Sequence, residues 1–332
     1  MKEYKVVNKT FVKSHNSVNK MMIRYTYSLI IYIIILAIIN LFLGNRTIIL
    51  NMFKMIIFSL VISSIISYLL NIIKKKTNFI KIYTEDNTLL IALLLGICGM
   101  HSTWHILLVA IIVTFILKHI LKNINISSSL YGLLIINIYN MFNNNINVLN
   151  YLKNNSFNVS FNEAISYAGG IINYLFGINN IAPLLAILVF IYLFYKKSVK
   201  YNIVISYIFT LSMMFLLYGI VNQVNIGLAF IMLFGDSLLF LVVYLIGDYI
   251  ATPTIKEGQI IYGITLAIMT FILRFTIPEI SIILPMIIGT FLLSKLLDNY
   301  SYKLKYNRKC YSLIISLLII IACISVGIIY FI

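Results

Sequence analysis

Acidic, hydroxyl and amide side chains gather in one short stretch of this chain, between two long apolar runs. The stretch reads Gly-Asp-Tyr-Ile-Ala-Thr-Pro-Thr-Ile-Lys-Glu-Gly-Gln and covers residues 247–259. Its candidate binding residues are Asp248, Thr252, Pro253, Gly258 and Gln259. A carboxylate, a hydroxyl and an amide can hold a polar ligand, but Pro and Gly are also common in simple turns. Polar backbone at membrane depth must be satisfied by protein or by a wet cavity, so the stretch is either a tight cytoplasmic turn or a binding site.

A second candidate binding residue is Asp236, near the middle of the apolar run 226–247. A carboxylate within a membrane-spanning segment is costly and therefore indicates a functional site. The alternative is a helix break at the preceding Gly235, with the acid capping a half-helix beside water. The sequence leaves both interpretations open.

Two further groups of polar residues have simpler interpretations. His101 and His105 have the i, i+4 spacing that can hold a metal on a helix, but no acidic residue lies near them, so we predict no metal site. Arg274 and Glu279 flank Pro278 at the end of an apolar run, where we expect a snorkelling side chain and an ion pair at the rim. The sequence has no nucleophile–base pair, phosphate-binding loop or dinucleotide fingerprint, which argues against a hydrolase or an ATPase.

The elements that must position these residues are membrane-spanning helices. Of 332 residues, 61% are hydrophobic and 10% are charged, with a mean hydropathy of +1.01, whereas a soluble domain carries about 25% charged residues. Apolar runs of roughly 20 residues recur, a length that helices and not strands require to cross a bilayer. We therefore predict an all-α polytopic membrane protein in contact with the lipid bilayer. The net charge of +16 follows from the positive-inside rule, and we predict no nucleic-acid partner.

The hydropathy pattern predicts eleven membrane segments, of which the third and fifth are short or polar enough to be half-spans. The segments are 25–43, 48–73, 87–100, 103–121, 126–142, 181–195, 201–221, 226–247, 260–274, 280–297 and 311–332. With the N-terminus in the cytoplasm and the C-terminus outside, most of the 25 Lys and Arg residues fall on the cytoplasmic side of a plasma membrane.

A polar, Asn-rich stretch divides these segments into two groups of five. Because five is odd, the second half is inverted relative to the first, an arrangement that places a site near the membrane midplane between the halves. The predicted core is thus about ten transmembrane helices in two inverted five-helix halves, with one extra C-terminal helix. The predicted parts are a cytoplasmic tail (1–24), a first half (25–142), an outer loop (143–180), a second half (181–298) and a basic loop with the extra helix (299–332).

The region from Gly235 to Tyr300 resembles the D subunit of Rnf-type electron transport complexes, to which the B subunit of the sodium-translocating NADH:quinone reductase is related. The similarity is collinear and without gaps. It runs through Asp248, Thr252-Pro253, the segment 258–263, Arg274, Pro278-Glu279 and Leu297-Asp298. Weaker similarity extends over most of the chain, and the last helix is an addition to the usual ten spans.

The resemblance implies a flavin-associated membrane subunit, at most a part of a redox-driven oxidoreductase that moves Na⁺ or H⁺. It implies partners among the other membrane, iron–sulfur and flavin subunits of such a complex. In that family one FMN is joined by a phosphoester to a Thr in the outer loop, and riboflavin is held non-covalently. The resemblance places a retained flavin site, with no catalytic residue of its own, at Asp248, Thr252, Pro253, Gly258, Gln259 and Asp236.

The chain departs from the family at the flavin-attachment segment. The best counterpart is Glu163-Ala-Ile-Ser-Tyr-Ala-Gly-Gly170, in which Gly169 stands where the attaching Thr is expected. Glycine has no oxygen to esterify, so we expect no covalent FMN and at most a non-covalent flavin. The departure also keeps an alternative open: a channel or transporter for a small polar solute, built on the same scaffold with Asp236 in its site.

Overall fold

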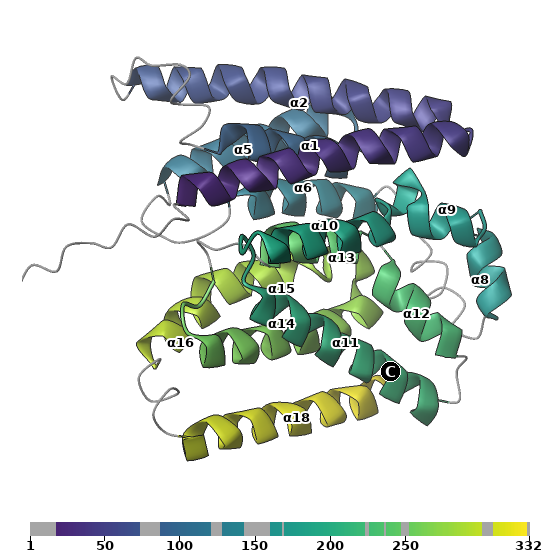
Figure 1. Cartoon of the computed structure of the whole chain (residues 1–332), viewed down its shortest axis with the longest axis vertical. Helices are drawn as coiled ribbons and strands as arrows, with labels where there is room; N and C mark the ends of the chain where they lie inside the picture. Colours follow the sequence, from purple (N-terminus) through teal and green to yellow (C-terminus); the bar gives the residue numbers. More distant parts are fainter. Residues whose placement is uncertain are drawn as a thin grey trace, which may run out of the picture.

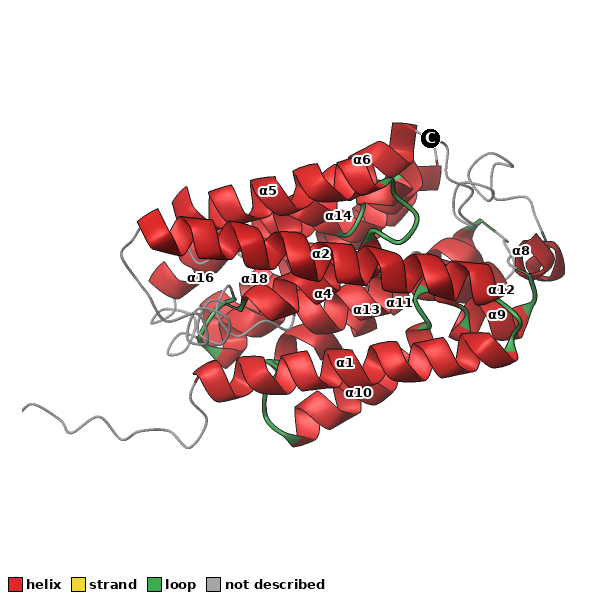
Figure 2. Cartoon of the chain, turned by 90° about the horizontal axis from the view of Figure 1, so that it is seen from above, coloured by secondary structure: helices red, strands yellow, loops and turns green. Residues whose placement is uncertain are grey.

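The computed structural model of the chain describes residues 18–73, 87–120, 128–142, 160–167, 169–222, 226–235, 237–246, 252–300 and 308–330. Within these ranges every regular element is a helix, and most helices run roughly along one common direction (Figures 1 and 2). This confirms the prediction of an all-α polytopic membrane protein.

The first half of the chain and the segment that follows it contain seven helices and one short 3₁₀ turn in the described ranges. The first half comprises α1 (Val18–Phe42), α2 (Arg46–Ile73), α4 (Thr88–Cys98), α5 (Trp104–Ile120) and α6 (Ser129–Phe142). The following segment comprises α8 (Phe161–Tyr167), α9 (Ile171–Phe176) and the 3₁₀ turn η1 (Ile178–Asn180).

The second half contains two long helices and several interrupted ones. It comprises α10 (Pro183–Tyr195), α11 (Tyr201–Val221), α12 (Ile226–Phe234), α13 (Leu238–Leu241), the π-helical η2 (Val242–Ile246), α14 (Lys256–Thr276), the 3₁₀ turn η3 (Pro278–Ile280), α15 (Ile283–Ile288), the π-helical η4 (Gly289–Leu293) and α16 (Ser294–Asn299). The last helix is α18 (Arg308–Tyr330).

Each of the eleven predicted apolar segments coincides with a helix or a broken helix. Five described helices are long and apolar enough to cross a membrane alone: Lys20–Phe42, Arg46–Leu70, Tyr201–Val221, Lys256–Thr276 and Cys310–Ile329. As expected, the third and fifth segments are short, since α4 has 11 residues and α6 has 14, whereas a span needs about 20. The eighth segment is broken into α12 and α13–η2, and the tenth into α15, η4 and α16.

The order in which helices pack recurs in the two halves. Helix α2 packs on α4 and α5 as α11 packs on α12 and α14, and α1 packs on α4 as α10 packs on α13. The halves meet where α1 contacts α10 and where α6 contacts α15 and η3. Helix α18 lies against α14 and α11, and its end marked C lies at the opposite end of the bundle from the start of α1 (Figure 1). These features fit the division into two halves of five, and the inverted orientation of the second half stays a prediction.

Helices α11 and α14 approach each other closely at Gly263. A Cβ atom at this position would overlap Ser206 Oγ and lie 2.7 Å from the carbonyl oxygen of Ile203. With the fully buried Ala267 one turn later, Gly263 forms the small-residue pair that lets membrane helices approach closely.

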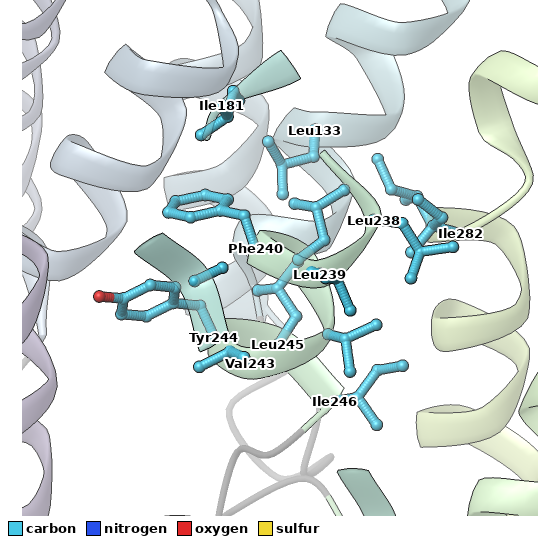
Figure 3. Close-up of a cluster of buried hydrophobic side chains, with 14 of the residues drawn as sticks. Leu133, Ile181, Leu238, Leu239, Phe240, Val243, Tyr244, Leu245, Ile246 and Ile282 are labelled. Carbon is cyan, nitrogen blue, oxygen red and sulfur yellow. The ribbon is translucent and has the colours of Figure 1, made fainter. Parts of the chain in front are cut away.

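The centre of the molecule is apolar. Every residue from Leu238 to Ile246 is at most 4% exposed. Side chains from other parts of the chain surround this α13–η2 segment, among them Leu133 on α6, Ile181 before α10 and Ile282 before α15 (Figure 3). The described surroundings of the α13–η2 segment are therefore largely aliphatic and aromatic side chains.

Candidate functional site

Four of the six predicted binding residues lie together where α14 begins. Thr252 and Pro253 precede the helix, and Gly258 and Gln259 lie in its first turn. Thr252 is 4% exposed and Gln259 is 7% exposed. The other two, Asp248 and Asp236, lie outside the described residues.

The side chain of Gln259 holds the turn before α14 in place. Its Nε2 atom donates to the carbonyl oxygens of Pro253, at 3.2 Å, and Thr254, at 3.3 Å. Its Oε1 atom accepts a hydrogen bond of 3.0 Å from Asn202 Nδ2 on α11. The turn is thus joined to both α11 and α14.

Lys200 is a member of this cluster that the sequence analysis missed. It is only 7% exposed, and its Nζ atom donates to the carbonyl oxygens of Thr252 at 2.7 Å and Pro253 at 3.1 Å. The sequence places it beside Lys196 and Lys197, which are exposed, so the positive-inside rule accounted for all three alike. No local pattern distinguishes the buried lysine, because its partners lie about fifty residues further along the chain.

A carboxylate closes the other side of the turn. Asp298, at the end of α16, accepts hydrogen bonds from the backbone nitrogen and the hydroxyl of Thr254, each at 2.9 Å. Leu297 and Pro253 both lie at ordinary van der Waals distance from the Cβ position of Gly258. Of the residues that carry the family resemblance, Thr252-Pro253, Gly258-Gln259 and Leu297-Asp298 lie together in one polar cluster at the start of α14. Arg274 and Pro278-Glu279 lie at the other end of α14.

In its described part, the polar groups of the cluster largely form hydrogen bonds with one another. Side-chain donors serve the carbonyl oxygens of Thr252, Pro253 and Thr254. This is the geometry that a tight turn requires, and it also supplies rigid support for a site. Binding of flavin by Asp248, Thr252 and Gln259 stays a prediction.

Replacing Lys200 with methionine is expected to loosen this turn. The substitution keeps the aliphatic stem but removes a charged donor to the carbonyl oxygens of Thr252 and Pro253, at a cost of about 1–3 kcal/mol. Thermal unfolding of the purified protein in detergent measures the effect. Lys197→Met is the matched control, because Lys197 is exposed. Equal unfolding temperatures for the two variants would contradict the role given to Lys200.

Arg274 is not the snorkelling residue that the sequence suggested. It is only 3% exposed, and its Nη2 atom donates to the carbonyl oxygen of Gly235 at 2.7 Å. The break between α12 and α13 explains the difference, because it places a carbonyl group inside the protein near the end of α14. The helix is broken at Gly235, as the alternative interpretation of this region expected. The role of Asp236 itself stays a prediction, because this residue lies outside the described residues.

The counterpart of the family's flavin-attachment segment, residues 163–170, comprises most of α8 and the two glycines that follow it. Helix α8 starts with a capping box, in which Ser160 N donates to Glu163 Oε2 at 3.1 Å and Glu163 N to Ser160 Oγ at 3.3 Å. Gly169 and Gly170 lie between α8 and α9 with φ angles of 81° and 97°, a conformation that favours glycine. Residue 169 offers neither a hydroxyl nor a backbone suited to threonine, so this position does not fit a phosphoester-linked FMN.

The histidine pair gives no indication of a metal centre. His101 lies in the turn between α4 and α5, where surrounding protein atoms lower the pKa of its imidazole by desolvation. Among the described residues, no group of three or more His, Cys, Asp or Glu side chains lies close enough to hold a metal ion.

The comparisons with known proteins bear on the whole chain. A search of curated proteins found no match. The model of the family described as NQR2, RnfD, RnfE matches residues 5–307, which include both halves and the polar cluster around Thr252 and Gln259. A match over this share of 332 residues is sufficient to assign the family. The chain belongs to the NQR2, RnfD, RnfE family and is a multi-pass membrane subunit of the Rnf/Nqr type.

Proposed function

We propose that this chain is the D-type membrane subunit of an Rnf-like electron transport complex that translocates Na⁺ or H⁺. The family match over residues 5–307 carries the proposal. The collinear resemblance from Asp248 to Asp298 supports the D-type assignment. Further support comes from the polar cluster at the start of α14, where Thr252, Gln259 and Asp298 lie close together. The proposed partners are the other membrane, iron–sulfur and flavin subunits of the complex.

We further propose that any flavin is held non-covalently. Gly169 lacks the oxygen that a phosphoester needs, and its positive φ supports the same conclusion. Bound flavin would supply one-electron steps between neighbouring redox centres, and the protein would position the ring and tune its potential. The residues proposed to line its site are Asp248, Thr252 and Gln259, with Pro253 and Gly258 shaping the turn.

Purified protein is expected to show a flavin absorption spectrum, and acid treatment is expected to release all of the flavin. The denatured chain is then expected to show no flavin fluorescence on a gel, because no covalent bond holds the cofactor. Fluorescence that stays with the denatured chain would contradict non-covalent binding. A colourless protein that has lost no partner subunits would remove the redox role altogether.

A pair of variants connects the flavin to the proposed site. Thr252→Val combined with Gln259→Leu is expected to lower the flavin content at least several-fold, since it removes a hydroxyl and an amide from the buried turn. Thr276→Val is the control, because Thr276 is exposed at the far end of the same helix. Co-purification of iron–sulfur and membrane subunits, identified by mass spectrometry, tests the proposed complex independently of flavin content.

A further inference from the structure

The break in the eighth membrane segment leaves backbone groups that a lipid environment cannot satisfy. Helix α12 ends at Phe234 and α13 begins at Leu238, with Ser237 in the left-handed region at φ 56°. Carbonyl groups at the end of one helix and amide groups at the start of the next have no partner within their own helix. Because hydrocarbon offers no hydrogen bonds, the protein must supply the partners.

Two side chains from the segment just before α10 supply partners on both sides of the break. Asn180, which is 8% exposed, donates from Nδ2 to the carbonyl oxygen of Phe234 at 2.8 Å, and its Oδ1 accepts from Ser237 N at 3.3 Å. Tyr174, which is 2% exposed, donates its hydroxyl hydrogen to the carbonyl oxygen of Ile231. A single amide thus bridges the last carbonyl of one half-helix and the first amide of the next.

The same segment is fixed on its other side to α1. Asn40, which is fully buried, accepts at Oδ1 from Ile178 N at 3.0 Å and donates from Nδ2 to the carbonyl oxygen of Phe176 at 3.3 Å. The hydroxyl of Tyr32 donates to the carbonyl oxygens of Ile181 and Ala182. The segment therefore connects the first helix of the first half to the interrupted helix of the second half.

The backbone of this segment adopts a conformation that the chain would not choose alone. Ile181 and Ala182 have φ angles of 48° and 32°, both in the left-handed region. A β-branched residue is rarely found there, and such a conformation persists only where several interactions impose it. The hydrogen bonds from Tyr32 and Asn40 are interactions of that kind.

We propose that residues 169–182, here termed the outer brace, hold α12 and α13 apart as separate half-helices and join them to α1. In the family that the chain resembles, the segment ending near Gly169 carries a covalent flavin. Here it forms the start of a structural element whose side chains form hydrogen bonds with the backbone of the broken helix. The outer brace acts through hydrogen bonds between side chains and backbone groups, none of which involves flavin. The proposal therefore holds whether or not the complex binds flavin.

Accessibility of a cysteine at the break tests the outer brace. Ser237→Cys is placed in a variant lacking Cys98, Cys310 and Cys323, and the rate of alkylation by a maleimide is measured on the full chain in membranes. Adding Asn180→Leu is expected to raise this rate at least tenfold, because the break loses its bridging amide. Tyr174→Phe, which removes one hydroxyl and keeps the ring, is expected to raise it by a smaller factor.

Two controls separate opening of the break from general loss of stability. Asn162→Leu changes an exposed asparagine on α8 and is expected to leave the rate at Ser237→Cys unchanged. Ala110→Cys, at a fully buried position on α5, reports global unfolding. An unchanged rate at Ser237→Cys in both brace variants would overturn the proposal. So would a parallel rise at Ala110→Cys, since the outer brace would then have no local effect.

Discussion

Gly263→Ala is expected to push α14 away from α11 and to lower the free energy of unfolding by about 1–3 kcal/mol. The added methyl group would overlap Ser206 Oγ and meet the carbonyl oxygen of Ile203 at 2.7 Å. The hydroxyl can rotate away, but the carbonyl belongs to the helix backbone and can move only with the whole helix. The loss of stability is measured by unfolding the protein in detergent with heat or with denaturant.

Two variants make this prediction specific. Gly327→Ala on α18 adds the same methyl group at a site with no atom within 4 Å and is expected to leave stability nearly unchanged. Combining Gly263→Ala with Ser206→Ala is expected to recover only part of the loss, because the clash with Ile203 remains. Full recovery would show that the hydroxyl alone sets the limit, and equal stability of Gly263→Ala and wild type would refute the close approach of the two helices.

Arg274→Met is expected to destabilise the protein by about 1.5–3 kcal/mol, the range for a hydrogen bond to a charged group. Methionine fills much of the same volume but cannot donate to the buried carbonyl oxygen of Gly235. The break between α12 and α13 would lose a donor that reaches it from α14. The same unfolding measurement applies, with cysteine accessibility at residue 237 as a local readout.

The control for this variant is Arg46→Met at the exposed start of α2. A snorkelling arginine at a membrane surface contributes little to folding, so this variant is expected to stay within about 0.5 kcal/mol of wild type. Equal losses of stability in the two arginine variants would contradict a stabilising role for the buried hydrogen bond of Arg274.

The sequence predicts well whatever depends on hydropathy. Each of the eleven apolar runs coincides with a helix or a broken helix. The shortness of α4 and α6 was expected, whereas that of α10, with 13 residues, was not. Gly235 marked the one break that could be anticipated, because glycine next to an acid inside an apolar run disfavours a continuous helix. The resemblance located the polar cluster from Thr252 to Asp298.

The sequence could not show which polar residues stabilise the fold through tertiary hydrogen bonds. Asn180 bonds to Phe234, which is 54 positions away, and Asn40 bonds to Ile178 at a separation of 138. Such pairs follow from tertiary packing and leave no periodic signal. Arg274 was predicted to lie at a rim for the same reason. Only the folded structure shows that the break between α12 and α13 brings the carbonyl oxygen of Gly235 to its side chain.

The transporter alternative depended on a polar site near the midplane between the halves. In the described residues, the α13–η2 segment at the centre is enclosed by apolar side chains, among them Leu133, Ile181 and Ile282. A path for a polar solute is not favoured through this segment, because each polar group placed there would need a partner. Asp236, on which the alternative depended, lies outside the described residues, so the alternative stays a prediction.

The burial of α13 and η2 also has a consequence for biogenesis. Their neighbours include Leu133, made well before them, and Ile282, made after them. When synthesis of α14 ends, the segment 238–246 still lacks the side chains of α15 that will cover it. Contacts distant in sequence form late. The packing around the innermost part of the finished protein is thus completed only after most of the chain has been translated.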